Sequence, residues 1–190
     1  MKSTIEYFLK PGHENTEETF KIVKEALASH QNIKKVILAS TTGATAKKAL
    51  SYFAETDVQL IVIPHQYDFS SKSNRFSKEI EEDLIREGHH VHYGTMLFHT
   101  DKLFGTTVPT TVANFLRCFS EGYKVCYEII LMAADGGLLE TGEQVIAIAG
   151  TSLGADTSLI MQAASTQNLR KLRVNEILCK PLYVREDSSN

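Results

Sequence analysis

The segment Val36-Ile37-Leu38-Ala39-Ser40-Thr41-Thr42-Gly43-Ala44-Thr45-Ala46 decides the fold class. Its first four residues form an uninterrupted apolar run, which is typical of a strand covered on both faces. Small and hydroxyl-bearing residues follow, and the apolar spacing then predicts a helix over Ala46–Phe53. A buried strand that passes through a short polar turn into a helix is the repeating unit of α/β proteins.

The same design recurs nearer the C-terminal end of the chain. Val145–Ala149 is a second buried run, residues 150–156 form a small polar turn, and a helix is expected over Thr157–Ala164. Other strands are expected at Ile5–Leu9, Val58–Ile63, His90–Phe98 and Val174–Lys180. Other helices are expected after Asn15, over Phe76–Arg86 and over Thr110–Ala134, where Gly122 is a candidate break. This alternation predicts a mostly parallel sheet with helices on both faces.

The composition and charge of the chain indicate which partners and which compartment to expect. The 190 residues carry a formal net charge of −3 and no long basic run, so nucleic acid is not an expected partner. No apolar stretch approaches the roughly 20 residues of a membrane span, so no membrane partner is expected either. The three cysteines include no CxxC pair, which favours a reducing cytoplasm. We expect one domain over 1–185 and a flexible tail over 186–190.

The two polar turns are candidate anion-binding loops. The free N–H groups and the dipole of a helix N-terminus favour negative charge, glycine allows close approach, and hydroxyls donate hydrogen bonds. If the two strands are neighbours where strand order reverses, both turns line one crevice. The candidate binding residues are Thr41, Thr42, Gly43, Thr45, Gly150, Thr151, Gly154, Asp156 and Thr157.

The two turns are expected to differ in role. The first contains no acid and is followed by Lys47 and Lys48, which makes it the better phosphate seat. Asp156 in the second turn would repel phosphate and suits a ligand hydroxyl better. A purely structural reading stays open, because small residues are common in such turns and Thr or Asp often only caps the helix.

Other polar residues give weaker signals. His65 follows a central strand and is a candidate ligand contact or an acid or base near neutral pH, although a structural hydrogen bond explains it equally well. Lys124 and Glu128 lie four apart on an apolar helix, where an architectural pair is the simpler interpretation. The cluster of His89, His90 and His92 is not expected to hold a metal. No catalytic set can be assembled from the sequence.

With these residues in place, the chain resembles a known family. Residues 40–46 after an apolar strand resemble the effector-phosphate loop in the C-terminal domain of pyruvate kinase. A closer match is to stand-alone archaeal and bacterial proteins of that fold, of unknown function, that bind flavin mononucleotide (FMN). The matching motifs are Lys10-Pro11-Gly12 with Asn15-Thr16, Thr41-Thr42-Gly43 with Thr45–Leu50, Lys124-Val125 with Tyr127-Glu128-Ile129 and Met132–Asp135, Gly150-Thr151 with Gly154–Thr157, and Lys180-Pro181.

The resemblance implies a three-layer α/β/α fold with a five-stranded, mostly parallel sheet whose last strand is an antiparallel edge strand. It implies FMN as the cofactor, with its phosphate and ribityl chain held by the two loops. Pyruvate kinase activity is not implied, because the catalytic barrel is absent. The chain departs from the pattern at Ala44 and at Ser152-Leu153, where relatives place basic residues, and the segment 66–69 lacks an expected glycine.

The leading prediction is a cytoplasmic protein that binds a phosphorylated small molecule, FMN first, with a flavin-dependent oxidoreductase role as one option. The alternative is a non-enzymatic sensor that binds a phosphosugar or nucleotide. A third option is a flavin-free enzyme that uses His65 or Glu128 as acid or base. A homo-oligomer is compatible with the sequence.

Overall fold

The computed structural model describes residues 3–69 and 74–183, so the expected tail 186–190 lies outside the described residues. Helices and strands alternate through the first half of the chain, and strands dominate the last quarter. The strands are β1 (Glu6–Phe8), β2 (Lys35–Ala39), β3 (Gln59–Ile63), β4 (His90–Val91), β5 (Gln144–Ala149), β6 (Thr157–Gln162) and β7 (Arg173–Pro181). The helices are α1 (Thr16–Ser29), α2 (Ala44–Phe53), α3 (Lys78–Arg86), α4 (Asp101–Phe104), α5 (Val108–Arg117) and α6 (Glu121–Asp135), with short 3₁₀ turns at His13–Asn15, Leu97–His99 and Thr166–Lys171.

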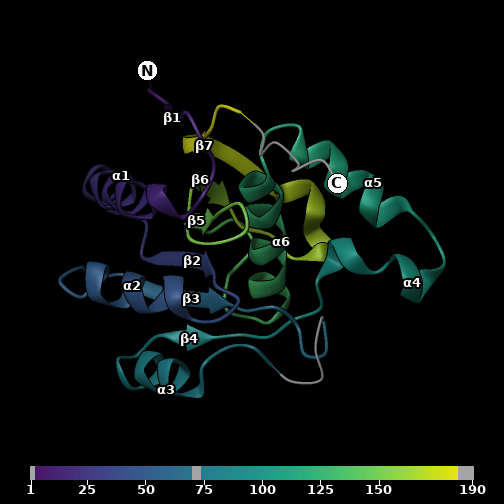
Figure 1. Cartoon of the computed structure of the whole chain (residues 1–190), viewed down its shortest axis with the longest axis horizontal. Helices are drawn as coiled ribbons and strands as arrows, with labels where there is room; N and C mark the ends of the chain where they lie inside the picture. Colours follow the sequence, from purple (N-terminus) through teal and green to yellow (C-terminus); the bar gives the residue numbers. More distant parts are fainter. Residues whose placement is uncertain (1–2, 70–73, 184–190) are drawn as a thin grey trace.

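One sheet runs through the molecule in the order β1-β7-β6-β5-β2-β3-β4 (Figure 1). Strand β2 pairs in parallel with both β3 and β5. Strand β6 runs antiparallel to both of its neighbours, β5 and β7. The sheet is therefore mixed and mostly parallel.

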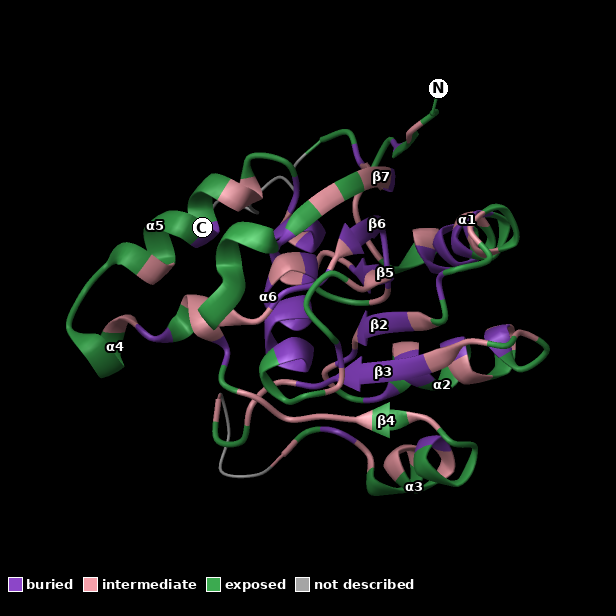
Figure 2. Ribbon diagram, turned by 180° about the vertical axis from the view of Figure 1, so that it is seen from behind, coloured by how far each residue is buried: buried purple, intermediate pink, exposed green. Residues whose placement is uncertain are grey.

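Helices cover both faces of the sheet. Helix α6 crosses one face, and α1, α2 and α3 lie on the other (Figure 1). Each face has its own apolar core, built from alternate residues of the same strands: Ile37 and Ala147 face the α6 side, whereas Val36 and Ile146 face the other. Figure 2 shows the central strands and α6 as the most continuously buried elements. The expected three-layer α/β/α class is confirmed.

The sheet differs from the expectation in size and in the place of its reversed strand. It has seven strands among the described residues instead of five, because β1 and β4 extend its two edges. The antiparallel strand is the internal strand β6, not an edge strand. The strand expected at Val174–Lys180 is present as β7, but β1 covers its outer side.

The helix expected over Thr157–Ala164 is wrong, because this segment forms strand β6. A short apolar run carries no periodicity that separates a buried helix from a buried strand. Here the backbone groups of Thr157–Gln162 pair with β5 on one side and β7 on the other. Tertiary pairing therefore decided the conformation.

Two other boundaries also differ. The single helix expected over Thr110–Ala134 is two helices, α5 and α6, and the break precedes Ser120 instead of falling at Gly122. The Ser120 side chain caps α6 by accepting a hydrogen bond from the Tyr123 amide at 2.9 Å. Of the strand expected over His90–Phe98, only β4 forms. Among the described residues, no helix has the length and apolar character to cross a membrane.

Candidate functional site

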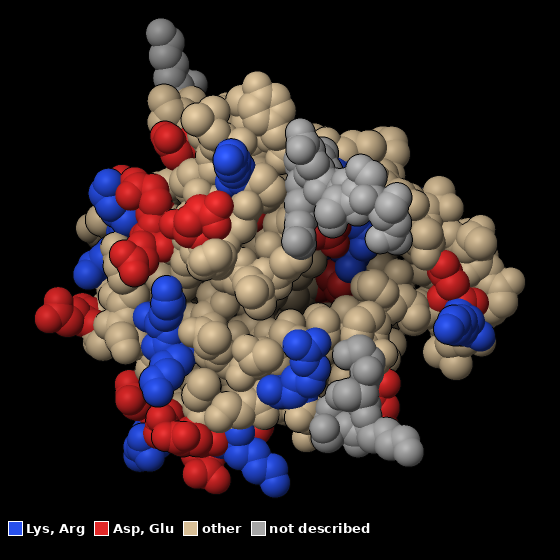
Figure 3. Space-filling model, in the orientation of Figure 1, with Lys and Arg blue, Asp and Glu red and all other residues tan. Residues whose placement is uncertain are grey.

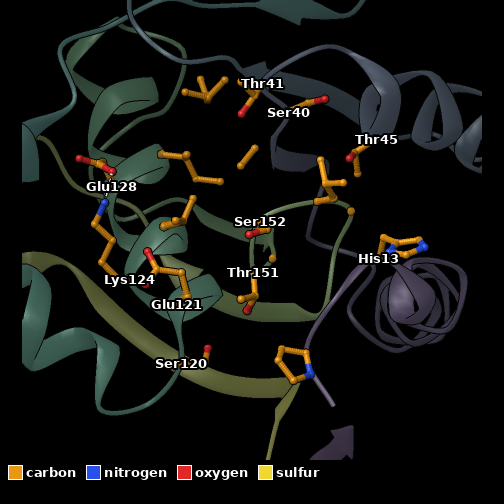
Figure 4. A pocket seen from close by; sticks show the side chains of 18 of the residues that line it. His13, Ser40, Thr41, Thr45, Ser120, Glu121, Lys124, Glu128, Thr151 and Ser152 are labelled. Atoms are coloured by element: carbon orange, nitrogen blue, oxygen red, sulfur yellow. Dashed lines mark hydrogen bonds and ion pairs between the residues drawn. The ribbon is translucent and has the colours of Figure 1, made fainter. Parts of the chain in front are cut away.

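A crevice opens where β2 and β5 lie side by side. From β2 the chain continues to β3 on one side, whereas from β5 it continues to β6 on the other. The loops after β2 and β5 therefore diverge at the carboxyl edge of the sheet, which is the usual ligand position in α/β folds. A cavity of about 870 Å³ lies there, between these two loops and α6 (Figure 4).

The β2–α2 loop forms one wall of this cavity. Thr41, Thr42 and Thr45 line it, and so does Lys48 in the first turns of α2. The Ser40 hydroxyl accepts a hydrogen bond from the Ala46 amide at 3.3 Å, which fixes the start of the helix. Helix α2 thus points its N-terminus, with its partial positive charge, at the cavity.

Gly43 serves the loop without lining the cavity. It precedes α2 with φ of 96°, a left-handed conformation that favours glycine. A Cβ on Gly43 would lie 2.8 Å from Ile80 Cδ1, so its open side faces α3. Its contribution is to shape the turn that places the threonines.

The β5–β6 loop forms a second wall. Gly150, Thr151 and Gly154 line the cavity, together with Ser152 and the exposed Leu153. Because β6 follows, this loop does not itself lead into a helix. Gly154 packs tightly against the N-terminal segment, since a Cβ there would lie 2.6 Å from His13 Cα. This wall therefore supplies hydroxyls and a close backbone, without a helix of its own.

Asp156 and Thr157 lie behind that wall, fully buried. Asp156 Oδ2 accepts hydrogen bonds from the Gly12 and Thr151 amides, each at 3.0 Å. Its Oδ1 accepts one from the Thr157 hydroxyl at 2.9 Å. Neither residue lines the cavity. The carboxylate predicted to face a ligand hydroxyl instead ties the loop at Gly12 to the β5–β6 loop.

His65 lies at the cavity edge, as its place after β3 predicted. A hydrogen bond of 3.2 Å joins His65 Nε2 to the Thr41 hydroxyl. The Phe69 ring packs edge-on against the imidazole, with 4.9 Å between the two ring centroids. Its Nδ1 is buried without a hydrogen-bond partner in the described part of the chain. Burial, followed by the charges of Arg75 and His99, lowers the pKa of His65 and favours the neutral ring.

A charged cluster on α6 forms the far wall. Lys124 and Glu128, one turn apart and almost fully buried, form an ion pair of 2.7 Å. Lys124 Nζ also donates to His99 Nε2 at 3.1 Å, and Glu128 Oε1 accepts from the Phe98 amide at 2.9 Å. All of these side chains except Phe98 line the cavity, and Figure 4 shows the pair on a wall separate from that of Ser40, Thr41 and Thr45.

One N–H group of the Lys124 ammonium has no hydrogen-bond acceptor among the described residues of this cluster. An ammonium group has three N–H bonds, and Lys124 uses two of them within the described residues. Loss of water around the ring and the Lys124 charge lower the pKa of His99, so a neutral His99 accepts from Lys124. From the sequence an architectural pair was the simpler interpretation, with a position facing the crevice left open. The contribution of His99 was not predicted, because it depends on where the 97–99 turn packs.

The cavity lining is positive, although the whole chain has a formal net charge of −3. Among the described residues, five basic side chains line it, against two acidic ones. They are Lys48, Arg75, Arg117, Lys124 and Lys180, with Glu121 and Glu128. Glu121 and Glu128 pair with Arg117 and Lys124, whereas Lys48 and Arg75 form no ion pair within the described ranges. In Figure 3 basic side chains stand beside a hollow near the centre of the face.

Sequence reasoning missed several lining residues. Pro11, His13 and Thr16 reach the cavity from the N-terminal segment, and Ser120 and Arg117 reach it from the α5–α6 junction. The Pro11-Gly12 turn and the Ser120 cap were visible signals of these loops. Their approach to the site was not, because it depends on how distant segments pack. The His89, His90 and His92 cluster lies outside the cavity lining, and His89 Nδ1 accepts a hydrogen bond from the Leu60 amide at 3.2 Å.

Comparison with known proteins matches the chain to a family model and to solved structures. The family model described as pyruvate kinase, alpha/beta domain, matches residues 21–161. Among solved structures, Cryptosporidium parvum pyruvate kinase in complex with ADP matches 76% of this chain at 18% identity and a TM-score of 0.39. The match spans 23% of the length of that pyruvate kinase chain.

Proposed function

The chain belongs to the pyruvate kinase alpha/beta domain family, and we propose that it binds a phosphate-bearing small molecule. FMN is the first candidate ligand, and the cavity between the β2–α2 and β5–β6 loops is the proposed site. The observation that carries the proposal is the positive cavity at the N-terminus of α2. A phosphate is the anion that such a wall of amides, hydroxyls and a lysine suits best.

The phosphate position in this proposal is the start of α2. The amides of Ala44 and Thr45 donate no hydrogen bond within the described residues, and the hydroxyls of Thr41, Thr42 and Thr45 stand beside them. Lys48 adds a full positive charge on the same helix. The basic residue expected of relatives at position 44 is absent, but Lys48 and Arg75 supply positive charge in the lining.

The rest of the cavity suits FMN in size and character. Its volume of about 870 Å³ falls within the roughly 300–1,000 Å³ of pockets that enclose drug-sized ligands. Hydroxyls of Thr151 and Ser152 line the route from the phosphate position, which suits a ribityl chain, and Phe69, Met96 and Met132 supply apolar surface for a ring. The spare N–H of Lys124 suits a ring carbonyl oxygen. A bound flavin would supply electron or hydride transfer.

A phosphosugar or nucleotide sensor is the second candidate. The high density of hydroxyl groups on both loop walls favours it, because such walls also match a sugar. In that case the α2 N-terminus keeps its role as the phosphate position and no redox chemistry takes place.

The first experiment is an absorbance spectrum of freshly purified protein, repeated after FMN is added and the excess is removed. We expect flavin bands that persist in the wild type and are lost in Thr42→Asp, which places a negative charge beside the phosphate. Thr42 is exposed, so this change does not disturb the core. Thr141→Asp, exposed and outside the cavity, is the matched control and should retain flavin.

Other outcomes separate the two candidates. A colourless protein that binds ribose 5-phosphate or ADP in calorimetry, with binding lost in Thr42→Asp, would replace FMN by the sensor function. A protein that binds neither flavin nor these phosphates would contradict the proposed site as a whole.

A further inference from the structure

Helix α5 carries apolar side chains on two adjacent faces. Pro109, Ala113 and Leu116 lie on the face that packs against α6 and the 97–99 turn. Val108, Val112 and Phe115 repeat at intervals of four and three residues on a second face, about a quarter turn away around the axis. A helix that only had to cover α6 would need one such face.

This second face belongs to a larger exposed apolar strip, here called the α4–α5 stripe. It consists of Leu103, Phe104, Val108, Val112, Phe115 and Phe119, whose exposed fractions range from 42% to 73%. Helices α4 and α5 project from the body of the molecule (Figure 1). In Figure 3 their surface is mostly uncharged, with charged side chains gathered at one end.

The area of the stripe is large for a monomer. If each of the six side chains is given about 150–250 Å², the range for aromatic residues, these exposed fractions leave roughly 500–900 Å² uncovered. Monomeric proteins rarely expose contiguous apolar patches of more than a few hundred Å². A standard specific interface buries about 800 Å² on each partner, so the stripe matches half of a stable dimer interface.

We infer that the α4–α5 stripe is a homodimer interface, in which the stripes of two copies pack against each other about a two-fold axis near Val112. Val112 lies near the middle of the stripe, with phenylalanines towards both ends. Antiparallel pairing about this axis sets Val112 against its own copy, Val108 near Phe115 and Phe104 near Phe119, so apolar side chains oppose one another along the contact.

The charged residues around the α4–α5 stripe are also compatible with the pairing of two copies. No Lys, Arg, Asp or Glu belongs to the stripe. Its start is flanked by Asp101 and Lys102, and Arg117 and Glu121 beyond its end pair with each other, so neither end carries a net charge. Antiparallel packing thus brings together ends without net charge, and like-charge repulsion does not oppose it.

Segments of this chain outside the described residues do not match the stripe in chemistry. Residues 1–2 are Met-Lys, residues 70–73 are Ser-Ser-Lys-Ser, and residues 184–190 contain a single apolar residue, Val184. A second copy supplies an apolar surface of equal size, which these segments lack.

The test is the mass of the full chain in solution by sedimentation equilibrium, at concentrations on the order of 10 μM, where an interface of this size is expected to be populated. We expect twice the monomer mass of 21.2 kDa. Val112→Glu and Phe115→Glu should each weaken dimerisation at least about 30-fold, the size of effect seen at interface hot spots. Ile85→Glu is the matched control, since Ile85 is 59% exposed on α3, away from the stripe.

A charge swap tests the two-fold axis itself. Val112→Glu and Val112→Lys should each be monomeric alone, and their mixture at low salt should form a heterodimer, because the two side chains meet at the axis. Three results would overturn the inference: a wild-type monomer at every concentration, a dimer that both glutamate variants leave intact, or a monomer that instead binds neutral phospholipid vesicles through this face. None of these measurements depends on the ligand, so the dimer and the proposed function stand or fall separately.

Discussion

At the scale of single residues, the buried pair Lys124–Glu128 joins stability to the cavity. Removing Lys124 leaves the Glu128 carboxylate buried without its ammonium partner. Breaking one side of a buried pair typically costs about 3–5 kcal/mol, whereas replacing both partners by apolar groups costs far less.

We therefore expect Lys124→Met to lower the free energy of unfolding by about 3 kcal/mol or more in urea titrations. The double variant Lys124→Met, Glu128→Leu should recover most of this loss, short of about 1–3 kcal/mol for the Phe98 amide that loses its acceptor. Equal instability of the single and double variants would contradict a buried ion pair.

The two cavity histidines give stability a pH dependence. The pKa values of His65 and His99 are lowered in the folded chain, first by burial of the rings, from an ordinary value of 6.5. As pH falls below 6.5, the unfolded chain binds protons before the folded chain does, so stability decreases. The contribution of these two histidines to the free energy of unfolding is fully present above pH 6.5. It is lost as the pH falls towards their pKa values in the folded chain.

We expect the urea concentration at the midpoint of unfolding to decrease as the pH is lowered from 7.5 to 5. The double variant His65→Gln, His99→Gln should show a smaller decrease than the wild type, because it lacks both titrating rings. The same decrease in wild type and variant would show that other groups carry the pH dependence.

At the scale of elements, the contact of α6 with β6 depends on Gly122. A Cβ at this position would lie 2.6 Å from Thr157 Cβ and 3.1 Å from Asp156 Oδ1, and it would also meet the Thr157 hydroxyl. Helix propensity favours alanine over glycine by about 1 kcal/mol in a helix interior, and by less in the first turn, where Gly122 lies. Overpacking in a close contact costs about 1–3 kcal/mol.

Gly122→Ala is therefore expected to destabilise the protein by roughly 1 kcal/mol net, and to perturb the Asp156 network that holds the β5–β6 loop. Thermal unfolding followed by circular dichroism measures this. A stabilised variant would mean that α6 can move away from β6 and that propensity decides.

Element predictions from the sequence succeeded where local patterns are strong. Strands β2, β3 and β5 are continuous apolar runs, and α2 follows a small polar turn, so their type could be read locally. The segment Thr157–Ala164 could not, because its apolar residues fit either state and its pairing partners β5 and β7 are set by the whole sheet. Because β6 replaces the expected helix, the second loop also lacks the helix N-terminus that the prediction placed there.

At the scale of the whole molecule, ligand binding should be visible as stability. A ligand at 100 times its Kd stabilises the folded state by about 2.7 kcal/mol, which for a domain of this size raises Tm by roughly 5–10 °C. Lys48→Gln should reduce the Tm shift given by FMN, because Lys48 lines the cavity. Lys47→Gln is the neighbouring control, since Lys47 is exposed and does not line it. Equal losses in both variants would place the ligand elsewhere.

The sequence by itself determined the α/β class, the central strands, the two polar loops and the edge of the sheet at which they lie. These features depend on the order of residue types within one segment, an unbroken apolar run followed by small polar residues, which neighbours in the chain fix. Only the tertiary structure decided that β6 is an internal reversed strand, that Asp156 ties two loops together, that His99 meets Lys124, and that one apolar face of α5 is exposed. Each of these depends on contacts between segments far apart in the chain, and local periodicity carries no information about which distant segments meet.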